Sequence, residues 1–178
     1  MRRLFSGKKM LTFTYTGQFQ NGKRHGQGRL ECSDGSVYEG TFEHDQIWGR
    51  GKFTYADGCT YEGEVANGKA HGEGLYTWPE GSWHRGSFSN GVPSGKGFIS
   101  YSDGRTYDGW WYQGKKSGRG IFTWPDGSRY EGMFADDVRS GKGRYTYPTG
   151  DVYEGDFLKD KPHGRGIETG DIGWRYEG

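Results

Sequence analysis

The stretch Tyr61–Gly74, YEGEVANGKAHGEG, threads four glycines through an alternating, strand-like pattern. Glycine weakens a β-strand, because it loses more backbone freedom on folding than other residues and has no side chain to pack. The chain nevertheless repeats this pattern in phase, every 23 residues. The first position is held by Tyr15, Tyr38, Tyr61, His84, Tyr107, Tyr130, Tyr153 and Tyr176. A fixed period of this kind predicts an array of stacked repeats.

Each repeat contains two segments of period-two alternation, such as residues 38–42 and 51–55. Alternation of this kind predicts antiparallel strands, and no segment shows the spacing of an amphipathic helix. In the sequence Trp124-Pro125-Asp126-Gly127, proline fixes φ near −65°, so we expect a type I turn followed by a left-handed glycine. This turn would place Phe122 opposite Tyr130 and Gly120 opposite Gly132.

The opposite side of each hairpin is expected to close with a longer loop, which in the first repeat is Asn21–Arg24. Such a loop would place Gly17 opposite Gly28 and Phe19 opposite Gly26. Taken together, the two turns align glycines in a strip across one face of the sheet, beside a mostly aromatic row.

The glycine strip explains why the chain tolerates a poor strand former. Neighbouring rings can lie over a surface without side chains, and burying one ring contributes roughly 1.5–3 kcal/mol. An interior glycine costs only about 0.5–1 kcal/mol relative to alanine. We therefore interpret these glycines as structural: Gly40, Gly63, Gly86, Gly109, Gly132 and Gly155.

At these residues the chain resembles the MORN (membrane occupation and recognition nexus) repeat family. The match runs through Tyr61–Glu64, Asn67–Lys69 and His71–Gly74, and departs from the family pattern where His84 replaces a tyrosine. The resemblance implies an all-β fold, an elongated, twisted, single-layer antiparallel sheet of 23-residue β-hairpin repeats. Residues 1–11 would form a basic N-terminal tail. Residues 12–178 would form the array, with seven full repeats and the start of an eighth.

The composition excludes several classes of protein. Aromatic residues are abundant, with 7 Trp, 13 Tyr and 10 Phe, which argues against the disorder suggested by a hydrophobic content of 30%. A formal net charge of +1 gives no expectation of nucleic-acid binding. No apolar run is long enough for a transmembrane helix, and the two cysteines, Cys32 and Cys59, share no motif. An intracellular, reducing location is expected.

The sequence predicts no enzyme, no metal site and no cofactor. His25, His71 and His163 recur at multiples of the repeat, so they should lie on separate loops. A catalytic or metal site requires convergent side chains. The Gly-x-Gly pairs do not lead into a helix, which excludes a phosphate-binding loop of the nucleotide-binding kind.

Proteins of the resembled family act as scaffolds and adaptors, so we expect a non-enzymatic scaffold in a cytoskeletal, ciliary or membrane-associated assembly. Its partners would be proteins, including an amphipathic helical segment held on the aromatic-glycine face. Tryptophan is enriched at binding hot spots. The predicted contacts are Trp78, Trp83, Tyr107, Trp111, Trp124 and Phe134. The alternative interpretation of this face is that its rings replace a conventional core.

A second hypothesis is a phosphoinositide- or anionic-membrane-binding module, acting as the regulatory part of a larger enzyme. Its basic candidate contacts are Arg2, Arg3, Lys8, Lys9, Lys23 and Arg24. The sequence ends in an incomplete repeat, Tyr176–Gly178, whose exposed strand edge would invite pairing. Homodimerisation through this C-terminal edge is therefore a further expectation.

Overall fold

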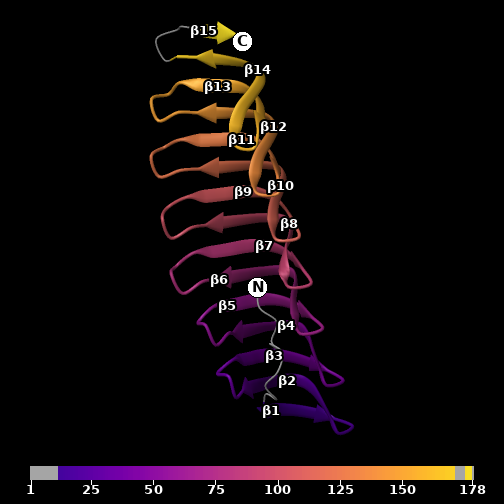
Figure 1. The fold of residues 1–178 in the computed structure, drawn as a ribbon. Helices are drawn as coiled ribbons and strands as arrows, with labels where there is room; N and C mark the ends of the chain where they lie inside the picture. The colour runs from indigo at the N-terminus through magenta and orange to yellow at the C-terminus, as the bar shows by residue number, and fades with distance from the viewer. Residues whose placement is uncertain (1–11, 171–174, 178) are drawn as a thin grey trace. The chain divides into compact units, whose positions relative to one another are not determined.

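The computed structural model describes residues 12–170 and 175–177, and all their regular structure is β-strand (Figure 1). The chain forms two compact units, residues 1–93 and 94–178, and the boundary falls near the start of β8. Within each unit, successive strands pair antiparallel in chain order. The expected all-β fold of antiparallel hairpins is confirmed. The N-terminal tail predicted at residues 1–11 lies outside the described residues.

The strand bounds follow the 23-residue period. The first unit contains β1 (Phe13–Gln20), β2 (Lys23–Cys32), β3 (Val37–Glu43), β4 (Gln46–Thr54), β5 (Thr60–Ala66), β6 (Lys69–Thr77) and β7 (Trp83–Ser89). The second contains β8 (Val92–Ser100), β9 (Thr106–Tyr112), β10 (Lys115–Thr123), β11 (Arg129–Ala135), β12 (Val138–Thr146), β13 (Val152–Leu158), β14 (Lys161–Thr169) and β15 (Arg175–Glu177).

The proline-containing turn has the predicted geometry. The amide of Gly127 donates to the carbonyl of Trp124 at 3.0 Å, and the amide of Trp124 donates to the carbonyl of Ser128 at 2.9 Å. Gly127 adopts a φ of 90°, which glycine reaches without steric cost. The Asp126 carboxylate accepts a further hydrogen bond from the Ser128 amide at 2.8 Å. The predicted pairing of Phe122 with Tyr130 is confirmed.

The predicted longer loop on the other side is wrong. Asn21 (φ 52°) and Gly22 (φ 73°) form a two-residue turn in which both residues have positive φ, as a type I′ turn requires. Gln20 pairs directly with Lys23 across it. The Asn-Gly dipeptide is the usual signal of such a turn. A continuous register from the pair Gly17–Gly28 requires a four-residue loop, and this requirement led to the wrong prediction.

A bulge accounts for the difference. Gly17 pairs with Gly28 as expected, but Phe19 pairs with Arg24 and not with Gly26. The short segment around Gln18 therefore faces the longer segment around Gly26, which takes a φ of 67°. The predicted pairing of Phe19 with Gly26 is therefore wrong. On its other side Gly26 pairs with Phe42 of β3.

The bulge also determines where each tyrosine hydroxyl binds. Tyr61 lies across the glycine strip and donates its O–H to the carbonyl of Glu64 at 2.6 Å, next to the break in the ladder. A Cβ atom on Gly63 would lie 2.7 Å from this hydroxyl, and one on Gly74 would lie 2.5 Å from Cε2 of the same ring. The tyrosine rings therefore pack directly on the glycine strip, and any side chain at these glycines would occupy the volume of the rings.

Ring-to-ring contacts complete the interior of this thin fold. Tyr130 meets Phe134 of its own repeat at 5.2 Å and Phe157 of the next repeat at 4.9 Å between centroids, both edge to face. Such pairs stabilise by about 0.5–1.5 kcal/mol beyond the burial of their area. Tyr130 is fully buried, and this burial raises the pKa of its phenol to about 12. Tyr130 thus joins its own repeat to the next.

Candidate partner-binding surfaces

Three of the six predicted partner contacts belong to the interior of the aromatic face. Tyr107 is fully buried, and Phe134 and Trp111 are only 5% and 8% exposed. The indole N–H of Trp111 donates to the carbonyl of Gly97 at 3.2 Å, a bond that fixes the ring against the neighbouring strand. These side chains therefore offer a partner little surface, and their role in binding stays a prediction.

The other tryptophans are half-buried. Trp78 packs on Tyr76 at 4.6 Å between ring centroids, and Trp124 packs on Phe122 at 4.5 Å. Trp83 alternates with the buried His84 along β7, so it lies on the opposite, polar face, where the guanidinium of Arg85 covers it at 5.8 Å. Of the six predicted contacts, Trp78 and Trp83 belong to the first unit and the other four to the second.

A groove on the aromatic face of the second unit does bring Trp124 and Phe134 together. It has a volume of about 470 Å³ and is lined by Tyr101, Arg105, Lys116, Phe122, Trp124, Phe134, Asp137, Arg139 and Asp160. The guanidinium carbon of Arg139 lies 5.7 Å from the Trp124 ring and 5.5 Å from the Phe157 ring. The groove therefore combines an aromatic floor with paired charges at its rim.

Sequence reasoning did not place any basic side chain on the aromatic face. Arg24, Lys116 and Arg139 lie over tyrosine and phenylalanine rings within 6 Å. Each forms an ion pair with an aspartate 21 residues later in the chain, which lies in the two-residue turn of the next repeat. The pairs are Arg24–Asp45 at 3.3 Å, Lys116–Asp137 at 3.6 Å and Arg139–Asp160 at 3.2 Å.

A signal for these pairs is present in the sequence. When the second residue of the two-residue turn is Asp, the residue 21 positions before it is basic. When that turn residue is Gly68 or Gly91, the residue 21 positions before it is Ile47 or Ala70. In both cases the same backbone bond forms, since Gly68 donates its amide to Ile47 and Asp160 donates to Arg139. The carboxylate adds a bond back, as Asp160 Oδ1 accepts from the Arg139 amide at 2.9 Å.

A second groove of about 400 Å³ lies on the aromatic face of the first unit. Its lining includes Phe13, Leu30, Ile47 and the Arg24–Asp45 pair. Arg24 was predicted as a lipid contact, but its guanidinium lies 5.4 Å from the Phe42 ring inside this groove. Lys23 is exposed on the turn. The other lipid candidates, Arg2, Arg3, Lys8 and Lys9, lie outside the described residues.

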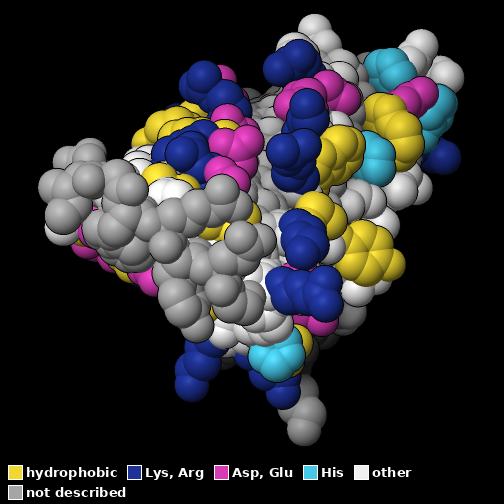
Figure 2. All heavy atoms as spheres, turned by 90° about the horizontal axis from the view of Figure 1, so that it is seen from above, with side chains coloured by type: hydrophobic (Ala, Val, Ile, Leu, Met, Phe, Trp, Pro, Cys, Tyr) yellow, Lys and Arg dark blue, Asp and Glu magenta, His cyan; other side chains and the backbone are white. Residues whose placement is uncertain are grey.

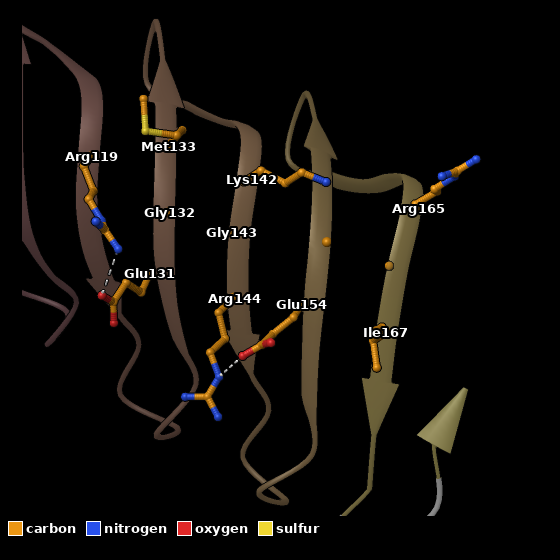
Figure 3. Close-up of a pocket in the computed structure, with 12 residues that line it drawn as sticks. Arg119, Glu131, Gly132, Met133, Lys142, Gly143, Arg144, Glu154, Arg165 and Ile167 are labelled. Carbon is orange, nitrogen blue, oxygen red and sulfur yellow. Dashed lines mark ion pairs between the residues drawn. The ribbon is translucent and has the colours of Figure 1, made fainter. Parts of the chain in front are cut away.

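The polar face carries a groove of its own in the second unit, with a volume of about 830 Å³. Its floor is the reverse side of the glycine strip, at Gly132, Gly143, Gly155 and Gly166. Figure 3 shows Met133, Lys142 and Arg165 on one side of the labelled glycines, and Glu131, Arg144, Glu154 and Ile167 on the other. The acids are paired, with Arg144 Nε 2.8 Å from Glu154 and Arg129 2.9 Å from Glu131.

The histidines do not converge. His25 lies 5.6 Å from His44 between ring centroids, while His71 and His163 are exposed in other repeats. Within residues 12–170 and 175–177, no group of three or more His, Cys, Asp or Glu side chains is placed to hold a metal ion. His84 differs from the other histidines, because it is fully buried and this burial lowers its pKa to about 4. No helix in the described part of the chain has the length and apolarity to cross a membrane.

Comparison with known sequences gives a series of seven family matches. The sequence model of the MORN repeat matches seven consecutive segments, which are residues 15–37, 38–60, 61–83, 84–104, 107–129, 130–152 and 153–175. These segments have the phase of the hairpins described above, since each begins with the tyrosine, or His84, that lies over the glycine strip.

One solved structure shows a likeness of fold. The TCP domain of Drosophila melanogaster SAS-4 (dCPAP), in complex with a proline-rich motif of Ana2 (dSTIL), is 16% identical with a TM-score of 0.52. The match covers 85% of this chain and 83% of that one. The G-box domain of the microcephaly protein CPAP is 15% identical, with a TM-score of 0.44 over 94% of this chain and 98% of that one. At this level of identity the likeness concerns the fold alone.

Proposed function

The chain belongs to the MORN repeat family, and from this premise we propose that it is a non-enzymatic scaffold that binds protein partners through its aromatic-glycine face. The observation that carries the proposal is the groove lined by Trp124 and Phe134 in the second unit. Phe134 lies buried beneath this groove, while Trp124 and Tyr101 are half-buried and keep exposed ring surface. Exposed ring surface framed by charged groups is typical of protein-binding hot spots. The occupant we propose is an amphipathic helical segment, whose apolar side would lie on the rings.

The assembly that this scaffold serves is proposed to be cytoskeletal, ciliary or membrane-associated. The SAS-4 TCP domain, which shares the fold, is described in complex with a proline-rich motif of another protein. A sheet of this kind can therefore hold a polypeptide ligand. Homodimerisation through the C-terminal edge stays a prediction, and a monomer mass that does not change with concentration in light scattering would contradict it.

The test is affinity capture of protein partners with the full chain as bait, compared with a Trp78→Ala/Trp124→Ala variant. These two side chains are half-buried, so their removal takes away binding surface while leaving the buried tyrosines in place. We expect the variant to capture about tenfold less of each partner protein, or still less, because truncation of hot-spot residues weakens binding to this degree. Quantitative mass spectrometry of the captured material checks this.

The matched control is Trp48→Ser, which removes an exposed tryptophan and installs the residue found at the same repeat position in Ser94, Ser117 and Ser140. The control bait should recover the same partners as the unaltered chain. Thermal unfolding of all baits establishes that they are folded. Recovery of the same partners by the Trp78→Ala/Trp124→Ala bait would show that the aromatic face serves only as the interior of the fold.

A further inference from the structure

The polar face of the second unit carries a regular row of basic side chains, one per repeat. Each immediately precedes a glycine of the strip on β8, β10, β12 or β14, and all are exposed; they are Lys96, Arg119, Lys142 and Arg165. In the first unit the same repeat position holds Gln27, Arg50 and Glu73. The row is therefore a property of the second unit and not a requirement of the fold.

Exposed apolar side chains lie opposite the basic row on β9 and β11, while the equivalent position on β13 holds Asp156. Trp110 is 48% exposed and pairs with Lys96, whose ammonium lies 5.8 Å from the ring. Met133 is 42% exposed and pairs with Arg119. Figure 2, which views the protein from above, shows Lys and Arg side chains beside hydrophobic ones on the surface. Neighbouring cationic and apolar groups form a surface suited to a ligand with both acidic and apolar positions.

The charge of this row is only partly neutralised within the protein. Lys142 has a carboxylate at 3.0 Å in Asp156, and Arg119 reaches Glu131 only at 3.8 Å (Figure 3). Among residues 12–170 and 175–177, no ion pair involves Lys96 or Arg165. The groove therefore presents an excess of positive charge above a floor of glycine backbone.

The spacing of the row selects the conformation of the ligand. Equivalent side chains one repeat apart are separated by two strands, or about 9.4–9.8 Å. A polyproline II helix advances about 9.3 Å per three-residue turn, so every third side chain would meet one basic residue. Same-side residues of an extended strand recur at about 6.6–6.8 Å, and those of an α-helix at about 10.5 Å every seven residues. Of these three spacings, only that of the polyproline II helix matches the distance between basic residues closely enough to hold over several repeats.

We infer that this polar face binds an acidic polyproline II segment of a partner protein. The segment would run across β8–β14 and would lie over the glycine-floored groove where it crosses β10–β14. Acidic side chains at every third position would pair with the basic row. The proline rings between them would pack on Trp110 and Met133, as aromatic grooves accept polyproline ligands elsewhere. This face is separate from the aromatic face, so this inference and the proposed function can each fail alone.

The test uses two fluorescein-labelled peptides of equal composition and charge, titrated with the full chain in fluorescence anisotropy. The first peptide has four Glu-Pro-Pro triplets, and the second has four consecutive glutamates followed by eight prolines. We expect the periodic peptide to bind about tenfold more tightly, as the gain of several surface ion pairs implies. The Arg119→Gln/Arg165→Gln variant should lose this preference, and so should Trp110→Ser.

Arg50→Gln is the matched control, since Arg50 holds the same repeat position in the first unit, and this variant should bind as the unaltered chain does. Equal affinity for the two peptides would overturn the inference, as would full retention of the preference in Arg119→Gln/Arg165→Gln. Vesicles containing phosphatidylserine provide a further arm. Binding to these vesicles that is lost in Arg119→Gln/Arg165→Gln, without any preference between the peptides, would also overturn it and assign the row to a membrane surface.

Discussion

At the scale of single residues, the fold depends on one tyrosine per repeat lying over glycine. The phenol has a place for its hydroxyl because the bulge leaves a carbonyl beside the break in the ladder, as Glu64 does for Tyr61 and Met133 does for Tyr130. His84 takes this place in the fourth repeat. Its ring packs edge to face on Phe88 at 5.2 Å, so the aromatic contact persists while a titratable group enters the interior.

His84 makes the stability of the protein depend on pH. Burial lowers the folded pKa to about 4 from an ordinary value of 6.5, so between these values the unfolded chain binds a proton that the folded chain does not. The contribution of the neutral His84 to the free energy of unfolding is therefore fully present above pH 6.5 and is lost as the pH falls towards 4. The slope contributed is up to about 1.4 kcal/mol per pH unit.

We expect His84→Tyr to remove this contribution, so that its free energy of unfolding falls less than that of the unaltered chain between pH 6.5 and pH 4. Chemical denaturation at a series of pH values measures the difference. His71→Gln is the control, because His71 is exposed. Identical pH profiles for His84→Tyr and the unaltered chain would rule out His84 as the source.

At the scale of the elements, adjacent hairpins are joined through their turns. Asp160, at φ 68° in the turn between β13 and β14, binds both the amide and the guanidinium of Arg139 in the preceding repeat. The guanidinium in turn donates to the Asp160 carbonyl. This arrangement allows Asp to hold a turn position that elsewhere belongs to glycine, because the bonds to the neighbouring hairpin offset the unfavourable backbone conformation.

A double-mutant cycle tests this junction. Arg139→Ile and Asp160→Gly together recreate the Ile47–Gly68 combination of the second and third repeats. We expect each single change to destabilise by roughly 1–2 kcal/mol and the double change to cost less than their sum, with a coupling of about 0.5–3 kcal/mol. Lys115–Asp136 is the control pair, at 3.0 Å but largely exposed. A coupling no larger than that of Lys115–Asp136 would show that the junction is not cooperative.

At the scale of the whole molecule, each hairpin depends on its neighbours in chain order, as in other repeat arrays. A local defect should therefore stay local. A Cβ atom on Gly132 would lie 2.6 Å from the Tyr130 ring and equally close to the Gly143 backbone, so a larger side chain must displace the ring or the strand. The equivalent contact at Gly109 is 2.5 Å from the Tyr107 hydroxyl.

We expect Gly132→Val to destabilise the second unit by about 2–4 kcal/mol, as a buried clash with lost ring packing implies. Amide hydrogen exchange should accelerate in β10–β12 while β3–β5 keep their protection. Gly127→Ala, in an exposed turn with open space around the added methyl group but a φ of 90°, is a milder control. Unchanged exchange in Gly132→Val would contradict the role of the glycine strip.

The sequence by itself determined the repeat period, the class of fold, the proline-containing turn and the glycine pairing, because these follow from local backbone preferences and a strict periodicity. Tertiary structure decided what local rules do not express. The bulge shifts the register between Gly17 and Phe19, and it supplies the carbonyl that each tyrosine binds. Burial of Trp111 and the placement of Arg139 among rings depend on the next repeat. The basic and apolar side chains of the polar face also form a surface only because equivalent strands of successive repeats lie two strand spacings apart in the sheet.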